Sequence, residues 1–296
     1  MTLKEFATTT QAKVAARLNK ETDLKEVLKL NGIKRYGLII FDSAINVSPT
    51  IYLEPFYGKF LETQDWDCVI EDIIKLYRDN MPGEPMDTKI FFDFSQVKEK
   101  IFYRLINYAE NRELLEQMPH IRFLDLAKVF CIRYEKEEVG SGIISIYHSH
   151  LEHWGISADE LETVADVNSP LFMAQRISNM SSVLVENGVS QEDLSVPMPE
   201  EFSSVYVMSN ISKSNGAGTI CYPNILKTLS EKADRDIIIL PSSIHEVILI
   251  PFNENENMET FRDMVHYVNA NALDPEDFLS DNVYIYRRNT GQIEIA

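Results

Sequence analysis

The stretch that organises the chain is residues 215–251, which read NGAGTICYPNILKTLSEKADRDIIILPSSIHEVILIP. Its second half holds two apolar segments, DIIIL (236–240) and HEVILI (245–250), separated by a Pro-Ser-Ser turn. Both segments are apolar on both faces, which is typical of central strands covered on two sides. We therefore expect the middle of a sheet here.

The first half of this stretch predicts a loop and a helix. The run NGAG (215–218) lacks the lysine and spacing of a phosphate-binding loop and the third glycine of a dinucleotide-binding loop. Its expected role is a tight turn after a strand predicted over 205–210. Pro223 fits the first turn of a helix predicted over 223–232, where its missing N–H costs nothing.

The rest of the chain mixes helical and strand periodicities. An amphipathic helix is predicted over 66–77, and Asn31-Gly32 predicts a hairpin turn. We also expect a strand that runs into HSH (148–150) and a helix over 171–186. The helix over 66–77 is predicted from apolar residues at positions i, i+3, i+4, i+7, i+8 and i+11, which are Trp66, Val69, Ile70, Ile73, Ile74 and Tyr77. The pattern predicts an α+β protein with mixed or mostly antiparallel sheets and flanking helices.

A linker is expected at Met81-Pro82-Gly83-Glu84-Pro85, because proline and glycine interrupt regular structure. We therefore expect an N-terminal α/β region over residues 1–85 and a C-terminal α+β region over 86–296 that carries the main sheet. The alternative is that the two regions form one continuous domain.

Composition places the chain among ordinary globular proteins, with 45% hydrophobic and 25% charged residues. No apolar run approaches the roughly 18 residues of a membrane span, and the first residues lack the apolar segment of a secretory signal. The three cysteines, Cys68, Cys131 and Cys221, are odd in number and far apart in the sequence. Reduced thiols in a cytoplasmic protein without membrane contact are the simplest account.

The net charge of −18 is unevenly distributed. Residues 1–150 carry 20 Lys+Arg and 23 Asp+Glu, a net charge of −3, whereas residues 151–296 carry 8 and 23, a net charge of −15. This balance argues against direct nucleic-acid binding, which needs a basic surface. It is compatible with a protein partner that has a basic surface, or with mimicry of a nucleic acid. Solubility alone is the simpler explanation of the charge.

The strongest catalytic candidates lie at the start of the second apolar segment. His245 and Glu246 are an imidazole and a carboxylate near a strand end, and Ser242 and Ser243 precede them. Adjacent strand residues point to opposite faces, so His245 and Glu246 need separate partners. A structural histidine whose hydrogen bonds are satisfied is the alternative to a catalytic one.

Cys221 is a candidate nucleophile because it precedes a predicted helix N-terminus, a position that can lower a thiol pKa. Together with His245 and Asp236 it would form a cysteine-hydrolase constellation. The alternative is a buried cysteine that packs as an apolar side chain.

Three histidines in HSHLEHW, namely His148, His150 and His153, are candidate zinc ligands. A strand through residue 150 would place His148 and His150 on one face, and His153 would reach the same ion only through a turn near Leu151. No cysteine pair or fourth ligand accompanies them, so surface polar residues are the alternative. The sequence carries no cofactor signature, and we expect no cofactor.

Six segments, in this order, resemble the bacterial domain-of-unknown-function family 5688: SPTIYL (48–53), HLEHWGISADELETVADVNSP (150–170), NGAG (215–218), YP (222–223), LPSSIHEVILIP (240–251) and DPEDFLSDNVYIY (274–286). The resemblance covers nearly the whole chain and implies a cytoplasmic bacterial protein with no assigned activity. Ser242, Ser243, His245 and Glu246 fall in the family's signature segment. Cys221 and the three histidines fall where the resemblance implies no family feature.

These observations leave three hypotheses. The leading one is a non-enzymatic binding or regulatory protein whose acidic C-terminal half meets a protein partner. The second is a small-molecule enzyme, a hydrolase, with a site near Ser242–Glu246. The third is a nucleic-acid mimic that inhibits a DNA-binding protein.

Overall fold

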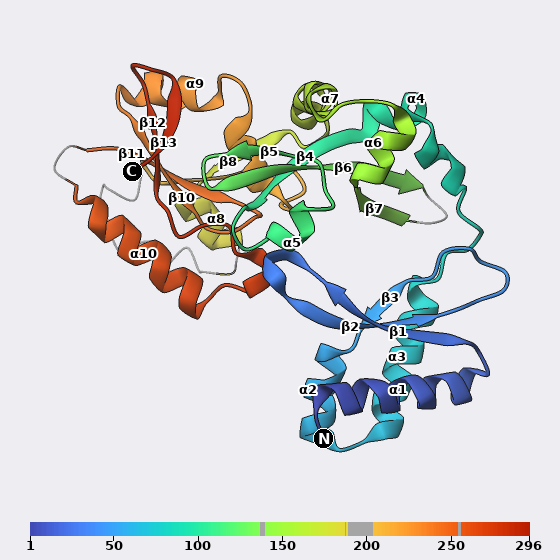
Figure 1. Ribbon diagram of the computed structural model, residues 1–296. Coiled ribbons are helices and arrows are strands. Elements are labelled where there is room, and N and C mark those ends of the chain that lie inside the picture. The colour runs from blue at the N-terminus through green and yellow to red at the C-terminus, as the bar shows by residue number, and fades with distance from the viewer. Residues whose placement is uncertain (137–139, 187, 189–203, 254–255) are drawn as a thin grey trace. The chain divides into compact units, whose positions relative to one another are not determined.

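The computed structural model describes residues 1–136, 140–186, 188, 204–253 and 256–296 (Figure 1). The chain forms two compact units. The first comprises Met1–Asp93 with Arg133–Ile143, and the second comprises Phe94–Ile132 with Ile144–Ala296. The division is therefore discontinuous in sequence, since strand β6 leaves the second unit and the chain returns to it through strand β7. Among the described residues, no helix is both long enough and apolar enough to cross a bilayer.

The first unit is an antiparallel three-stranded sheet with order β1-β2-β3, packed against three helices. The bounds are α1 Leu3–Leu18, β1 Thr22–Leu28, β2 Lys34–Ile40, β3 Thr50–Tyr52, α2 Glu54–Thr63 and α3 Trp66–Asn80. Asn31, with φ 58°, makes the predicted turn between β1 and β2. The predicted amphipathic helix is α3, which starts at an Asp65 cap and buries Ile73 and Ile74. These side chains share one core with Phe6 of α1 and Leu38 of β2.

The second unit carries the main sheet, as predicted. Six strands pair in the order β13-β12-β10-β11-β9-β8, and all the neighbours are antiparallel. Their bounds are β8 Gln175–Asn179, β9 Tyr206–Asn210, β10 Ile237–Pro241, β11 Val247–Pro251, β12 Tyr284–Arg287 and β13 Gln292–Ile295. The two apolar segments of the opening stretch are β10 and β11, the central pair. The α+β expectation with mostly antiparallel sheets is confirmed.

Helix α10 (Met258–Asn271) covers one face of this sheet. Its Phe261 and Val265 pack on Ile238 and Leu240 of β10. At roughly 25 cal/mol for each Å² of apolar surface removed from water, two buried side chains of this size stabilise the contact by several kcal/mol before conformational entropy is subtracted. The other face of β10 is covered by α9 (Ile225–Ala233), whose Leu226 is buried.

A second sheet, β4-β6-β5 with β7 paired to β6, is also antiparallel where its pairing is described. Its strands are β4 Ile101–Asn107, β5 His120–Phe123, β6 Leu126–Lys136 and β7 Gly140–Ser145. Helix α7 (Ala158–Phe172) packs against β4. The remaining α-helices are short: α4 Phe94–Val97, α5 Arg112–Leu115, α6 His148–Trp154 and α8 Met180–Glu186.

Two local predictions were wrong. Residues 148–150 do not extend a strand but open α6, whose first backbone amide, that of His148, donates to the Gln117 carbonyl. Residues 171–186 are not one helix, because 175–179 form β8, the edge strand beside β9. In both places hydrogen bonds to residues distant in sequence override the local periodicity.

Gly216 is the point of closest approach between the NGAG loop and the start of β11. Asn215 adopts φ 53°, and Gly216 begins a buried 3-10 helix, Gly216–Cys221. A Cβ atom on Gly216 would lie 2.5 Å from the His245 carbonyl oxygen and 2.7 Å from the Asn210 backbone nitrogen, and would also overlap the Ser209 hydroxyl. Two of these obstacles are backbone atoms, so the position requires glycine for lack of space.

We expect Gly216→Ala to lower the free energy of unfolding by about 1–3 kcal/mol, because backbone must move to admit the methyl group. Gly218→Ala is the matched control. The atoms nearest to its Cβ would be those of the Tyr103 ring, at 3.4 Å, and the Tyr103 carbonyl oxygen, at 3.7 Å, which are ordinary contacts, so we expect stability within about 1 kcal/mol of wild type. Urea denaturation measures both variants, and equal effects would contradict the packing argument.

The segment LSDNVY (279–284) is hydrogen-bonded to Asp125, which lies in the turn between β5 and β6 of the second sheet. One carboxylate oxygen accepts hydrogen bonds from the Ser280 hydroxyl (2.7 Å) and the Asn282 side-chain amide (2.9 Å). The other accepts from the Tyr284 hydroxyl (2.7 Å). Burial raises the pKa of Tyr284 above its ordinary value, so the phenol remains a donor. This network joins the two sheets of the second unit.

We expect Tyr284→Phe to cost about 1.5–3 kcal/mol of stability, because it removes a donor from a carboxylate. Tyr286→Phe removes a hydroxyl from the same strand, and among the described residues that hydroxyl has no hydrogen-bond partner. It should change stability by less than about 0.5 kcal/mol. Thermal or urea unfolding of the two variants compares them, and a Tyr286→Phe loss as large as that of Tyr284→Phe would exclude a special role for Asp125.

Candidate functional site

The catalytic candidates of the signature segment lie in the connection between β10 and β11. The His245 imidazole accepts a hydrogen bond at Nδ1 from the Asn215 backbone N–H (3.0 Å). A backbone N–H can only donate, so the ring proton is on Nε2, which lies 3.1 Å from a carboxylate oxygen of Asp277. The imidazole therefore bridges the NGAG loop and the segment DPED (274–277), and both of its nitrogens are engaged.

The neighbouring candidates shape the same connection. Ser243 is buried, and its hydroxyl oxygen accepts from the His245 backbone N–H (3.0 Å). The Glu246 carbonyl accepts from the Ser243 N–H (3.2 Å), which closes the turn. Ser242 and Glu246 are partly buried, and among the described residues no hydrogen bond joins either side chain to the imidazole. The arrangement fixes the entry to β11, and a catalytic role for these residues stays a prediction.

Cys221, His245 and Asp236 are not joined by the described contacts. The carboxylate partner of His245 is Asp277, whereas Asp236 accepts from the Arg287 side chain and the Arg288 backbone N–H, as described below. Asp277 was missed as a site residue at the sequence level, although it lies in the family segment DPED. The sequence analysis also missed two other residues of this connection. Asn215 donates to His245 through its backbone N–H, and Arg104 of β4 has its Nη1 3.4 Å from the Asn215 side-chain oxygen.

Cys221 borders a cavity of about 430 Å³ together with Lys128, Tyr222 and Tyr286. The Lys128 ammonium group is not available to activate the thiol. It lies 3.0 Å from carboxylates of Glu162 and of Asp166 on α7. Burial raises the pKa of the Cys221 thiol to about 12, although the Lys128 charge opposes the shift. A thiol of this kind is protonated near neutral pH and is a poor nucleophile.

We expect Cys221 in the folded protein to react with iodoacetamide at pH 8 at least ten-fold more slowly than in the urea-unfolded protein. The reason is that the thiolate is the reactive form and an unfolded cysteine has a pKa of about 8.5. Peptide mapping by mass spectrometry follows each cysteine separately, with Cys68 as an internal comparison. Rapid labelling of Cys221 in the folded state would restore the nucleophile hypothesis.

The three histidines proposed as metal ligands lie on α6, not on a strand. The His150 ring accepts from the Tyr147 backbone N–H at 2.9 Å, and burial lowers its pKa. Within the ranges that the structure describes, no group of three or more His, Cys, Asp or Glu side chains is placed to hold a metal ion.

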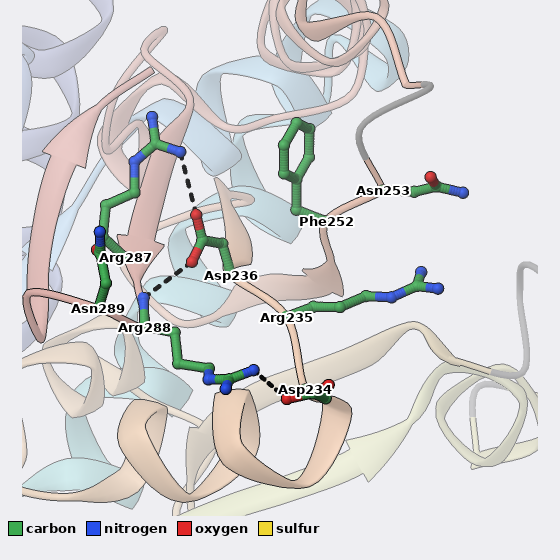
Figure 2. Close-up of a pocket in the computed structure, with 8 residues that line it drawn as sticks. All are labelled: Asp234, Arg235, Asp236, Phe252, Asn253, Arg287, Arg288 and Asn289. Atoms are coloured by element: carbon green, nitrogen blue, oxygen red, sulfur yellow. Dashed lines mark hydrogen bonds and ion pairs between the residues drawn. The ribbon is translucent and has the colours of Figure 1, made fainter.

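A cavity of about 960 Å³ lies at one end of the six-stranded sheet (Figure 2). It sits where β10 begins and where β11 and β12 end, and arginine and aspartate side chains line it. Asp236 accepts from Arg287 Nη1 (3.1 Å) with one oxygen and from the Arg288 backbone N–H (2.9 Å) with the other. Arg288 also pairs with Asp234. The sequence signals were the run DRD (234–236) before β10 and the pair Arg287-Arg288 at the end of β12.

The outward face of α10 is another candidate site. Tyr267 is 70% exposed, Met264 is 48% exposed and Val268 is 37% exposed. Residues three and four apart lie side by side on a helix, so the three side chains form one apolar surface, which we call the α10 face. Asp263, one turn before Tyr267, is exposed beside it.

Comparison with known families completes the description. The model of a family of unknown function, DUF5688, matches residues 3–288. The searches of curated proteins and of solved structures each found no match. Because the family match spans nearly the entire chain, the protein belongs to the DUF5688 family of unknown function.

Proposed function

We propose that the chain is a binding protein whose α10 face recognises a protein partner with a basic, partly apolar surface. The observation that carries the proposal is the exposure of Met264, Tyr267 and Val268 on one side of a helix whose opposite side is already buried. Tyrosine and methionine are enriched in protein interfaces, and exposed apolar side chains that adjoin one another commonly mark them.

Charge decides the kind of partner. The one Lys or Arg on α10, Arg262, is used within the protein, since it donates to Glu259 and to the Ala296 carbonyl. The carboxylate of Asp263 faces solvent beside Tyr267, and residues 151–296 carry a net charge of −15. A partner that carries lysine or arginine around an apolar side chain is complementary to this surface, and its association would be steered by the opposite charges.

The hydrolase alternative is favoured by one observation, the His245–Asp277 pair. A general base, however, needs a nitrogen free to take a proton, and both nitrogens of His245 are engaged. The binding proposal therefore has the stronger support. The nucleic-acid mimic is the special case in which the basic partner is itself a nucleic-acid-binding protein.

We expect Met264→Ser/Tyr267→Ser to weaken binding of a short synthetic amphipathic peptide of lysine and leucine by about ten-fold, or about 1.4 kcal/mol. Fluorescence anisotropy of the labelled peptide measures the Kd. The binding of wild type should weaken as salt rises, because the attraction is partly between exposed charges.

The matched control is Val167→Ser/Leu171→Ser, which removes two exposed apolar side chains from α7 instead. It should bind the peptide as wild type does. Equal losses in the two double variants would show that the peptide adheres to any apolar surface, and the α10 proposal would be abandoned.

A further inference from the structure

We infer that the cavity of Figure 2 is a binding site for an oxyanion, a carboxylate or phosphate group, carried on a small molecule with an apolar or flat portion. The inference does not depend on the α10 face. It rests on where the few cations of the acidic C-terminal half are placed, and on which of them is left without a carboxylate.

Arginine side chains are more frequent in the lining of this cavity than in the C-terminal half as a whole. Residues 151–296 contain eight Lys and Arg residues, and three of them, Arg235, Arg287 and Arg288, line it. Only two carboxylates, Asp234 and Asp236, line it with them. The lining therefore carries an excess of one positive charge within a region that is otherwise strongly negative.

The two carboxylates hold arginine residues in place. Both oxygens of Asp236 are engaged, one by the Arg287 guanidinium and one by the Arg288 backbone. Asp234 pairs with the Arg288 guanidinium, and Glu294 of β13 pairs with Arg287 from the other side. These contacts join the ends of β10, β12 and β13 and keep two guanidinium groups at the edge of the cavity.

Arg235 has no carboxylate partner among the described residues. Its backbone N–H donates to the Ser230 carbonyl (3.1 Å), which fixes the residue at the end of α9. Figure 2 shows its side chain extended away from Asp236, on the side of the cavity where Asn253 lies. A guanidinium group presents paired N–H donors that match the two oxygens of a carboxylate or phosphate. Arg235 is thus the group that would contact the oxyanion directly.

The surroundings of Arg235 suit a ligand larger than an ion. Phe252 supplies an aromatic wall to the same cavity, and Asn253 supplies a polar edge. Arg235 and Asn253 also line an adjoining cavity of about 580 Å³, to which Lys232 adds a cation and Glu256 an anion. The volume and the mixture of one aromatic ring with a few polar groups are typical of small-molecule sites.

Nuclear magnetic resonance titration of the full-length protein with phenyl phosphate, benzoate and inorganic phosphate tests the inference. We expect saturable shifts of the Arg235 Nε–H signal and of the Asn289 backbone amide. The tighter of phenyl phosphate and benzoate identifies the preferred oxyanion. Phe252→Leu should lose the advantage that phenyl phosphate has over inorganic phosphate, and an equal loss for both would remove Phe252 from the site.

Arg235→Gln should weaken binding of phenyl phosphate at least ten-fold, equivalent to about 1.4 kcal/mol. Arg176→Gln is the matched control, because it makes the same change on β8, an edge strand of the same sheet that does not line the cavity. It breaks a surface ion pair with Glu186 and a hydrogen bond to the Ser178 hydroxyl, both remote in sequence from the cavity lining, and should bind as wild type does. Binding by Arg235→Gln within two-fold of wild type, or no saturable shift in wild type up to roughly 20 mM ligand, would overturn the inference.

Discussion

The contact between the NGAG loop and the entry to β11 is the constraint on which the second unit depends. The backbones of Asn210 and His245 approach Gly216 so closely that there is no space for a Cβ atom. The backbone N–H of the neighbouring Asn215 donates to the His245 imidazole. His245 in turn holds Asp277, and the Asp277 carbonyl accepts from the Ile244 N–H (2.9 Å). Three segments far apart in the sequence are thus fixed at one place, where β10 ends and β11 begins.

Other segments of the second unit are held by contacts of the same kind. The Tyr222 hydroxyl donates to the carbonyls of Ser169 (3.0 Å) and Met173 (3.1 Å), so it holds the end of α7. Tyr284 and Ser280 bind Asp125 in the same manner. Polar groups with buried, satisfied hydrogen bonds specify one arrangement of apolar layers, which hydrophobic burial alone does not distinguish from others. The surfaces proposed for binding, the α10 face and the arginine cavity, lie outside these networks.

Much of the fold could be predicted because local patterns and tertiary packing agree in it. The apolar run of β10 is buried on both faces, that of β11 is buried on one face and partly buried on the other, and the spacing in α3 buries one stripe. The prediction of secondary structure failed where hydrogen-bond partners distant in sequence determine the type of element. Residues 175–179 become a strand only because β9 offers its edge, and His148 opens a helix although the sequence before it is strand-like. Long-range hydrogen bonds are not written in a short window of sequence.

The sequence by itself determined the class, the central strand pair, a loop at NGAG (215–218) and the acidity of the C-terminal half. These follow from periodicity, backbone sterics and composition, which are local or additive properties. Only the tertiary structure decided that His245 meets Asp277 and not Asp236, that the partly buried Cys221 lies near a lysine that is already paired, and that Arg235 has no carboxylate partner among the described residues. The roles of such side chains depend on which distant groups satisfy them, because an ionised group acquires its function from the partner it has or lacks.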